Sequence, residues 1–141
     1  MKKEKKTQDG NAFTIGKRKK AVARASFRKG NGVVKINSMP LESMNNELMR
    51  LKIKEPLILM GDEWKRFDIM VNVKGGGITG QAEACRQAIA RGISELMGDR
   101  AKNVFLSYDR NLLVYDPRRR ETRKPPRSSK GARRYKQRSK R

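Results

Sequence analysis

The residues best suited to chemistry are three consecutive glycines, Gly75, Gly76 and Gly77, between a predicted strand and a long predicted helix. Such a turn exposes backbone N–H groups, and a helix start adds partial positive charge, so it could hold a phosphate. Residues 75–81, GGGITGQ, match neither GxxxxGK[ST] nor GxGxxG, and no lysine follows into the helix, so a nucleotide pocket is disfavoured. Two interpretations stay open: a tight, closely packed turn, and a backbone contact with RNA phosphates.

Side chains that carry catalysis are otherwise scarce. The chain has no histidine, and Asp68, Glu83, Glu95 and Asp99 show no pairing that their spacing would impose. The single cysteine, Cys85, falls on the apolar stripe of a predicted helix, which indicates an unreactive core thiol in a reducing compartment. Without histidine a zinc site is disfavoured as well. We therefore predict no enzymatic activity, no catalytic residue, no metal site and no cofactor.

Positive charge is concentrated at the two ends of the chain. The whole chain of 141 residues carries +22, of which residues 117–141 hold +12 and residues 1–20 hold +6, leaving +4 for residues 21–116. Cations with so few acids among them indicate a polyanionic partner. Nucleic acid is favoured over a membrane, because residues 117–141 lack the Trp, Phe and Leu of an interfacial helix. No segment resembles a signal peptide or a membrane span.

The composition divides the chain into three parts. We predict a flexible basic arm at residues 1–11, a globular RNA-binding domain at residues 12–116, and an extended basic tail at residues 117–141. The tail has no aliphatic side chain larger than Ala, so it cannot bury enough apolar surface to fold alone. Tyr108, Tyr115 and Tyr135 are too dispersed to form a base-stacking platform. Recognition is therefore expected through phosphates and RNA shape.

Alternating apolar and polar residues predict the strands. The clearest is 66–74, with Phe67, Ile69, Val71 and Val73 on one face. Further strands are expected at 12–15, 21–29 and 33–36, the last pairing with 21–29 as a hairpin around the Gly-Asn-Gly turn at 30–32, and at 112–115. Residues 17–20, KRKK, abut strand 21–29, whose Arg24 and Arg28 face outward, so they form a basic patch rather than a run that only aids solubility.

Helices are predicted at 46–54, with Leu48, Leu51 and Met44 inward, and as a short turn after Pro56. A long helix capped by Thr79 buries a stripe at positions 82, 85, 89, 93 and 96 and stops at Gly98. A short helix follows at 100–106. This order of elements gives an α+β sandwich, one sheet with helices on one face.

Several blocks resemble one known family in order and in register. They are 16–25 (GKRKKAVARA), 30–32 (GNG), 66–68 (RFD), 75–84 (GGGITGQAEA), 88–93 (AIARGI) and 139–141 (SKR). Over residues 12–141 the chain resembles small-subunit ribosomal protein nine. Residues 112–119, LLVYDPRR, and the lysine after Arg18 are more similar to archaeal than to bacterial members, and Arg138 stands where many bacterial members have an aromatic residue.

The resemblance implies a fold like the second domain of ribosomal protein five, with a mixed four-stranded sheet and a left-handed β-α-β crossover. It implies a structural protein of the cytoplasmic ribosome, bound to the rRNA of the small-subunit head, the 3′ major domain. The tail then reaches the tRNA in the peptidyl site. Expected partners are small-subunit rRNA, peptidyl-site tRNA and neighbouring head proteins, with no membrane and no small-molecule substrate.

Site residues follow from the charge pattern and the resemblance together. The tRNA contacts are expected at Arg138, Ser139, Lys140 and Arg141. The rRNA contacts are expected at Lys17, Arg18, Lys19, Lys20, Arg24, Arg28, Lys74, Gly75, Gly76, Gly77, Arg118, Arg119, Arg120, Arg123, Lys124, Arg127, Lys130, Arg133, Arg134 and Lys136.

Two other classes of function fit parts of the sequence. A free nucleic-acid chaperone or compaction protein needs the same charge but not the glycine-helix register, and sedimentation of a native extract separates it from a ribosomal protein. A small-molecule kinase of the homoserine or mevalonate type shares the inferred fold, and a nucleotide titration tests it.

Overall fold

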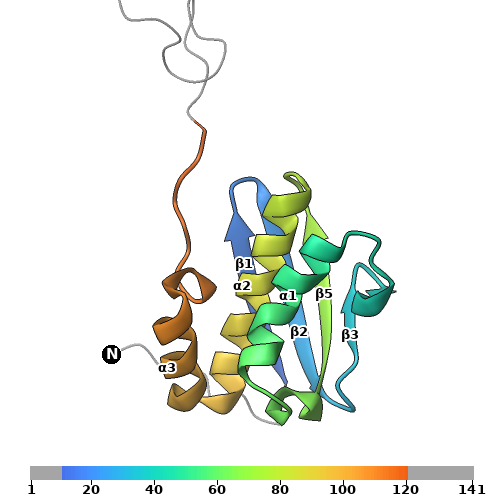
Figure 1. Ribbon diagram of the computed structural model, residues 1–141, viewed down its shortest axis with the longest axis vertical. Helices are drawn as coiled ribbons and strands as arrows, with labels where there is room; N and C mark the ends of the chain where they lie inside the picture. Colours follow the sequence, from blue (N-terminus) through green and yellow to red (C-terminus); the bar gives the residue numbers. More distant parts are fainter. Residues whose placement is uncertain (1–10, 121–141) are drawn as a thin grey trace, which may run out of the picture.

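One mixed sheet with helices on a single face forms the part of the chain that the computed structural model describes, residues 11–120 (Figure 1). The strand order is β1-β2-β5-β3-β4. The strands are β1 (Ala12–Arg18), β2 (Ala21–Lys29), β3 (Val34–Ile36), β4 (Met39–Pro40) and β5 (Phe67–Lys74). The helices are α1 (Glu47–Leu59), α2 (Ile78–Met97) and α3 (Asp99–Tyr108), with 3-10 turns η2 (Leu41–Ser43), η3 (Glu63–Arg66) and η4 (Arg110–Leu112).

The α+β class and the placement of helices on one face agree with the prediction, but the strand count and one pairing were wrong. The sheet has five strands because the two-residue β4 adds to the edge. The predicted hairpin does not form, because β3 runs parallel to β5 and not against β2. The carboxylate of Asp68 accepts the N–H groups of Asn31 and Val33, at 2.9 Å each, and this turns the chain away from β2.

Small residues line the side of β1 and β2 that meets α2. Gly16 lies so close to α2 that a Cβ there would overlap the carbonyl of Ala84. Thr14 donates its buried hydroxyl to the carbonyl oxygen of Ala88 at 2.7 Å. Fully buried alanines continue this surface on both elements, Ala21, Ala23 and Ala25 on β2 and Ala82, Ala84, Ala88 and Ala90 on α2. The helix therefore packs at short distance against the sheet, which small side chains alone permit.

Larger side chains fill the core on either side of that contact. Phe27 lies against Gly92 of α2, while Ile53 of α1 and Phe105 of α3 close the core from the two flanking helices. The thiol of Cys85 is 1% exposed, and burial raises its pKa to about 12, as expected for an unreactive core cysteine.

Helix α1 differs from its prediction in length and in orientation. It continues through Pro56, which is fully buried, so packing in the core offsets the backbone hydrogen bond that proline cannot make. Leu48 and Leu51, predicted to point inward, are 70% and 52% exposed, and Ile53 and Leu57 are buried instead. Met44, before the helix, is half-buried against the core.

The helix boundaries follow local backbone geometry. Helix α2 is capped by Gly77, and Thr79 lies inside the first turn, so the predicted cap was wrong. The end at Gly98 is confirmed, with φ of +74° and its N–H bonded to the carbonyl oxygen of Ser94. No strand forms at 112–115: η4 ends at Leu112, and a single parallel bridge joins Asp116 to Arg18. Within residues 11–120 no helix is long and apolar enough to span a membrane.

The contact between Gly92 and Phe27 gives a test of this packing. A Cβ at Gly92 would overlap the ring of Phe27, which is 1% exposed and has no room to move. We expect Gly92→Ala to lower the free energy of unfolding by about 1–3 kcal/mol, the usual cost of overpacking a core. Urea denaturation followed by circular dichroism measures it.

The matched control is Gly80→Ala in the same helix, where a Cβ meets only ordinary contacts at 3.6 and 3.7 Å. This change should leave stability unchanged or raise it by up to ~1 kcal/mol through helix propensity. Equal effects of the two substitutions would contradict the close packing.

Candidate nucleic-acid interface

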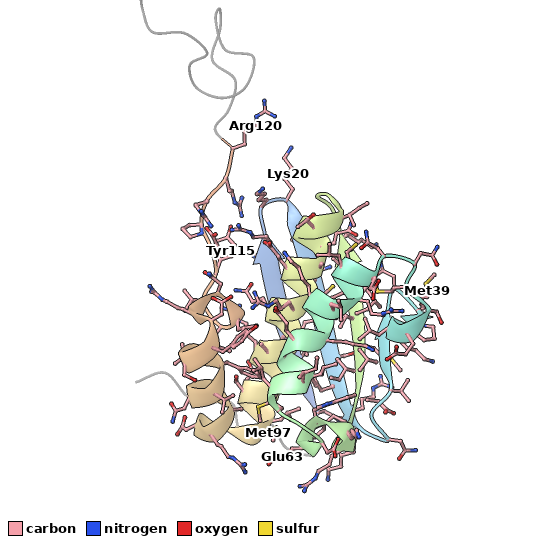
Figure 2. All side chains as sticks on the ribbon, in the orientation of Figure 1. Lys20, Met39, Glu63, Met97, Tyr115 and Arg120 are labelled. Atoms are coloured by element: carbon pink, nitrogen blue, oxygen red, sulfur yellow. The ribbon has the colours of Figure 1, made fainter. Side chains whose placement is uncertain are left out.

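Three segments that are distant in the sequence meet at one end of the molecule: the β1–β2 turn, the glycine turn after β5, and the chain after Asp116. A Cβ on Gly75 would lie 2.6 Å from the carbonyl oxygen of Lys20. Figure 2 shows Lys20 and Arg120 at this end, and Glu63 and Met97 at the opposite one. We call this region the basic end; it comprises Lys19, Lys20, Lys74, Gly75, Gly76, Gly77, Arg118, Arg119 and Arg120.

Glycine is required at two positions of the glycine turn. Gly75 and Gly76 have φ of +78° and +67°, and a Cβ on Gly76 would lie 2.9 Å from the backbone nitrogen of Ala21. The tight-turn interpretation is therefore correct. The phosphate interpretation remains open beside it, because the turn is exposed and no side chain caps the start of α2.

The chain that leaves the domain is held at Asp116 by Arg18. Arg18 ends β1 on the side facing α2, where its Nε donates to Glu83 at 2.6 Å and its Nη1 binds Asp116. Asp116 also accepts the backbone N–H of Arg118 at 2.9 Å and its Nη2 at 2.7 Å. The side chains of Arg18 and Asp116 are only 19% and 12% exposed. We call this network, Arg18, Glu83, Asp116 and Arg118, the tail root.

The protonation equilibria of the tail root reflect these bonds. Hydrogen bonds from the side chain and backbone of Arg118, and then from Arg18, hold the pKa of Asp116 well below its ordinary value against the opposing effect of burial. Burial opposes the charged form of Arg18, but bonds to Glu83 and Asp116 outweigh it, so the pKa of Arg18 is raised. Asp116 also raises the pKa of Arg118, so Arg18, Asp116 and Arg118 stay charged at neutral pH.

Arg91 provides a second attachment for the same segment. From α2 its Nε donates to the carbonyl oxygen of Leu113 and its Nη1 to that of Ile15, each at 2.9 Å. Further along, Arg119 lies over the ring of Tyr115, 6.0 Å from its centroid, and its Nη2 donates to the phenol oxygen at 2.8 Å. The chain direction after η4 is thus defined by bonds from β1, from α2 and from Tyr115.

The sheet face that carries no helices continues the basic end. Lys17 of β1, Val22 of β2 and Lys74 of β5 form one row across the strands, and Ile15, Arg24 and Asn72 form the next. Arg28 follows two residues beyond Ser26, on the same face. Apolar side chains lie between these cations, with Phe13 62% and Met70 45% exposed. We call this surface the open sheet face.

Comparison with known proteins identifies the family. The sequence model described as ribosomal protein S9/S16 matches residues 16–141. The chain belongs to this family. It is 46% identical over 127 residues, 89% of this chain and 95% of the relative, to small ribosomal subunit protein uS9 of Methanococcus maripaludis strain C7. It is 48% identical over 110 residues, 77% and 83% of the two chains, to the protein of the same name from Methanothrix thermoacetophila.

The resemblance drawn from the sequence blocks, with its preference for archaeal members, is thereby confirmed. The site residues stay predictions. Those within residues 11–120 fall into two groups, the basic end and the open sheet face, except Arg18, which lies in the tail root. Arg118 belongs to both the basic end and the tail root. The remainder lie outside the described residues: Arg123, Lys124, Arg127, Lys130, Arg133, Arg134, Lys136, Arg138, Ser139, Lys140 and Arg141.

Four residues that shape the basic end, the tail root and the open sheet face were not predicted from the sequence. Glu83, Arg91 and Asp116 hold the segment that precedes the tail, and Lys35 adds a cation that pairs in register with Met70 on the open sheet face. A signal was present for Arg91, a lone cation among the buried residues 88–94 of α2. None was present for Asp116, which sequence reasoning placed at the end of a strand.

The described residues offer little to a metal or cofactor. No cluster of three or more Asp, Glu, Cys or His side chains within residues 11–120 is placed to bind a metal ion. A crevice of about 210 Å³ at the tail root is lined by Arg18, Glu83, Arg86 and Asp116, which are engaged in ion pairs. The arrangement is suited to hold phosphates by cations and backbone N–H groups.

The lowered pKa of Asp116 predicts a pH-dependent contribution to stability. Because its folded-state pKa lies below the ordinary value of 3.8, the carboxylate stabilises the fold above about pH 4. This stabilisation disappears as the pH falls from 3.8 towards the lower folded-state pKa. We expect Asp116→Asn to unfold at a lower temperature than the unmodified protein at pH 7, with the difference shrinking below pH 4.

Thermal unfolding of both proteins from pH 7 to pH 2 makes the comparison. Asp62→Asn is the control, because Asp62 is 86% exposed and forms a local ion pair with Lys65. A difference between Asp116→Asn and the unmodified protein that does not change with pH would exclude this role of the carboxylate.

Proposed function

We propose that the protein binds the rRNA of the small-subunit head through its basic end and open sheet face, and reaches with its C-terminal tail to tRNA in the peptidyl site. The observation that carries this proposal is the tail root. The basic turns lie at the same end of the domain from which the basic tail departs, and Arg18 and Asp116 fix the point of departure. This arrangement is suited to direct a polycation into RNA.

The broader role follows from family membership. Proteins of the S9/S16 family are structural, non-enzymatic proteins of the small ribosomal subunit, so the protein acts in translation, in the ribosome of the cytoplasm. Its partners are accordingly rRNA and other ribosomal proteins. Family membership favours this role over the kinase and the free compaction protein, the two other classes that fit parts of the sequence.

Phosphate contacts of the domain are expected to come first from Lys19, Lys20 and the glycine turn. Lys19 and Lys20 are exposed at the tip of the β1–β2 turn, where no acid of the described chain binds them in an ion pair. The adjacent N–H groups at the start of α2 suit the same backbone. Arg18 instead supports the interface from beneath, because Glu83 and Asp116 already bind its guanidinium.

The tail supplies the contact with tRNA in this proposal. Residues 117–141 contain 13 Lys or Arg and one acid. At up to ~3.3 Å per residue, such a segment spans at most ~80 Å from the tail root. The terminal Arg138, Ser139, Lys140 and Arg141 would meet the phosphates of the anticodon stem-loop.

The finer description of the fold also stays a proposal. Strands β3 and β5 are parallel neighbours joined through α1, which gives the β-α-β unit expected from the family. We propose that this crossover is left-handed, as in the second domain of ribosomal protein five, although most such units are right-handed.

Counterion release tests the rRNA interface. If about half of the tail cations meet phosphates, log affinity of the full chain for head rRNA should fall with log salt with a slope on the order of −5. The double variant Lys19→Ala, Lys20→Ala should make this slope shallower by about 2. Filter binding or fluorescence anisotropy measures the slope between about 50 and 300 mM salt, roughly the range in which phosphate contacts are lost.

The control removes two cations from the opposite end, with Arg100→Ala and Lys102→Ala. Both side chains are exposed and pair locally, Arg100 with Glu63 and Lys102 with Asp99, each at 3.0 Å. This variant should keep the slope of the unmodified chain. A slope near zero, or an equal change in both double variants, would count against the proposed interface.

Removal of the last two residues tests the tRNA contact. Small subunits whose protein lacks Lys140 and Arg141 should assemble normally but bind peptidyl-site tRNA roughly tenfold more weakly, the loss expected from two charge-assisted contacts. Lys140→Arg with Arg141→Lys keeps the charge and should keep the affinity. Unchanged tRNA affinity in the truncated subunits would refute the contact.

A further inference from the structure

The open sheet face carries an exposed aromatic ring, that of Phe13, at the edge of the sheet. In β1 the alternate residues Ala12, Thr14 and Gly16 are buried towards α2, so Phe13 points away from the helices and is 62% exposed. Because β1 is the outermost strand, other strands adjoin the ring on one side alone. A large apolar side chain in water is informative when it belongs to a larger patch, and such a patch marks a binding surface.

The register of the strands leaves space beside this ring. Phe13 lies directly opposite Ser26 of β2, and Ser26 lies opposite Met70 of β5, which is 45% exposed. The small side chain of Ser26 turns to the backbone, where its hydroxyl donates to the carbonyl oxygen of Met70 at 3.3 Å. Strands β1 and β5 are two strand spacings apart, roughly 10 Å. A planar group can therefore lie over Ser26 with one face against Phe13 and the other towards Met70.

Cations flank the ring on both sides. Arg24 and Arg28 lie two residues before and after Ser26, so both are diagonal neighbours of Phe13, at ~7–8 Å, within reach of long side chains. Both are exposed, and neither forms an ion pair with an acid of residues 11–120.

The charge of the whole face has the same sign. Its one acid among the described residues, Asp68 opposite Arg28, already accepts the N–H groups of Asn31 and Val33. Against this acid stand five cations: Lys17, Arg24, Arg28, Lys35 and Lys74. A polyanion is thus the partner of complementary charge.

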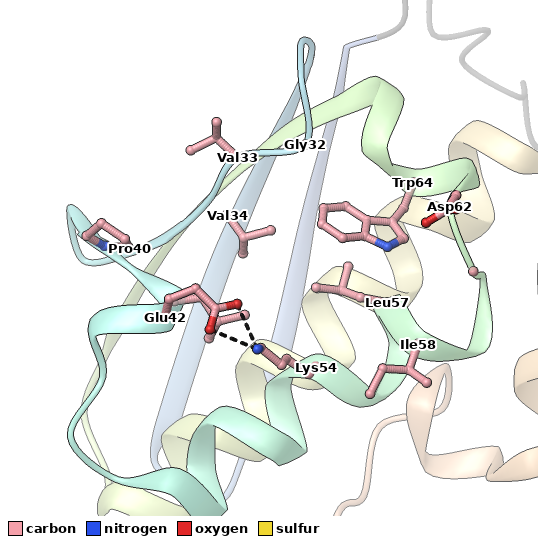
Figure 3. Close-up of a pocket in the computed structure, with 12 residues that line it drawn as sticks. Gly32, Val33, Val34, Pro40, Glu42, Lys54, Leu57, Ile58, Asp62 and Trp64 are labelled. Carbon is pink, nitrogen blue, oxygen red and sulfur yellow. Dashed lines mark hydrogen bonds and ion pairs between the residues drawn. The ribbon is translucent and has the colours of Figure 1, made fainter.

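The helix side of the molecule also exposes apolar surface, in a groove between α1 and the turns that flank β3 (Figure 3). Val34, Leu57 and Trp64 line it. Glu42 and Lys54 at its wall bind each other, with their atoms 2.7 Å apart (Figure 3). Because these charges compensate each other, the groove indicates no particular partner. The open sheet face differs, because its cations outnumber its acids.

We propose that the open sheet face binds one unpaired base of the rRNA, stacked on the ring of Phe13, while Arg24 and Arg28 bind the phosphates on either side of that nucleotide. The inference rests on the proposed function and deepens it by naming the feature of the RNA that this face recognises. A duplex hides the faces of its bases in the stack, whereas a loop or a bulge offers them to an aromatic side chain. Every nucleotide also combines a flat ring with a phosphate, which matches a ring flanked by arginines.

Charge disfavours the ends of this chain, and a second copy of it, as occupants of the face. Residues 1–10 contain four lysines and two acids, and residues 117–141 contain 13 cations and one acid. Both segments are therefore repelled by the cations around Phe13. A second copy would bring the same five cations against their equivalents.

Substitution of the ring tests the stacking contact, with the full chain and head rRNA as the binding pair. Phe13→Ala should weaken binding roughly tenfold, the usual loss when a stacking aromatic is removed. The slope of log affinity against log salt should stay unchanged, because no charge is removed. Phe13→Leu, which keeps the apolar surface but not the ring, should lose affinity as well. Phe13→Tyr keeps the ring and should restore it.

Arg24→Ala shows the opposite pattern, since loss of one phosphate contact should make the slope shallower by about 1. The control for loss of an exposed apolar side chain is Leu106→Ala on α3, because Leu106 is 48% exposed and lies away from the sheet. This variant should bind as the unmodified protein does. Thermal unfolding of each variant verifies that binding is measured on folded protein.

The outcomes separate this inference from the proposed function. If the unmodified protein shows the steep slope but Phe13→Ala or Phe13→Leu binds as tightly as it does, stacking is refuted and the phosphate contacts stand. If the unmodified protein shows a slope near zero, the proposed function fails first.

Photo-crosslinking in assembled small subunits supplies a second measurement. A p-benzoylphenylalanine takes the place of Phe13, and mass spectrometry and primer extension identify the crosslinked species. We expect an rRNA nucleotide that chemical probing shows to be unpaired. A crosslink to a paired nucleotide, to an acidic protein segment, to a second copy of this chain, or to nothing would overturn the assignment.

Discussion

The close contact between α2 and the sheet is the constraint on which the rest of this structure depends. Gly16, Thr14 and the alanines of β2 leave no room for larger side chains against Ala84 and Ala88. Small residues on the inner side bring the helix axis near the strands, and this brings Arg91 within reach of the carbonyl oxygen of Ile15. The same proximity allows Arg18 and Glu83 to meet at 2.6 Å. A looser interface would separate both pairs and leave the chain after η4 without attachment.

The small residues on the face of the sheet that meets α2 also explain the composition of the open sheet face. In most half-buried strands the larger apolar residues point inward, but in β1 the inner positions are Ala12, Thr14 and Gly16. Phe13 and Ile15 are therefore outside, between Lys17 and Arg24. In the proposed interface, this surface would offer cations to phosphates and flat apolar area to sugars and bases.

Strong local patterns in the sequence were sufficient to predict the elements whose structure depends mainly on neighbouring residues. The alternation of β5 and the apolar stripe of α2 predicted those elements to within a residue or two, and family blocks predicted which turns would be basic. The pairing of β3 with β5 could not be predicted from local patterns. It depends on the carboxylate of Asp68, which lies more than thirty positions away in the chain and binds the turn before β3. The end of α1 was predicted too early for a related reason. Pro56 is buried, which only the tertiary structure reveals, and this burial outweighs the usual effect of proline on a helix.

The candidate site residues show the same difference between what local patterns predict and what depends on long-range contacts. Clustered cations are visible in a sequence, so Lys19, Lys20 and Arg24 could be proposed from it directly. The groups that hold Arg18 and the segment before the tail are two acids and an arginine whose roles depend on long-range contacts: Glu83, Asp116 and Arg91. Arg18 belongs to both classes, since it looks like its neighbours in sequence but faces α2 and not solvent. Spacing alone could not separate it from Lys17 and Lys19.

The concentration of basic residues at the end of the molecule where Lys20 and Arg120 lie, opposite Glu63 and Met97, has a kinetic consequence (Figure 2). A protein whose charges were spread evenly would be attracted to RNA in any orientation. This one has an electric dipole, so the field of a polyanion exerts a torque on it during diffusion. Long-range attraction would turn the basic end towards RNA before any contact forms, and fewer collisions would be led by the opposite end.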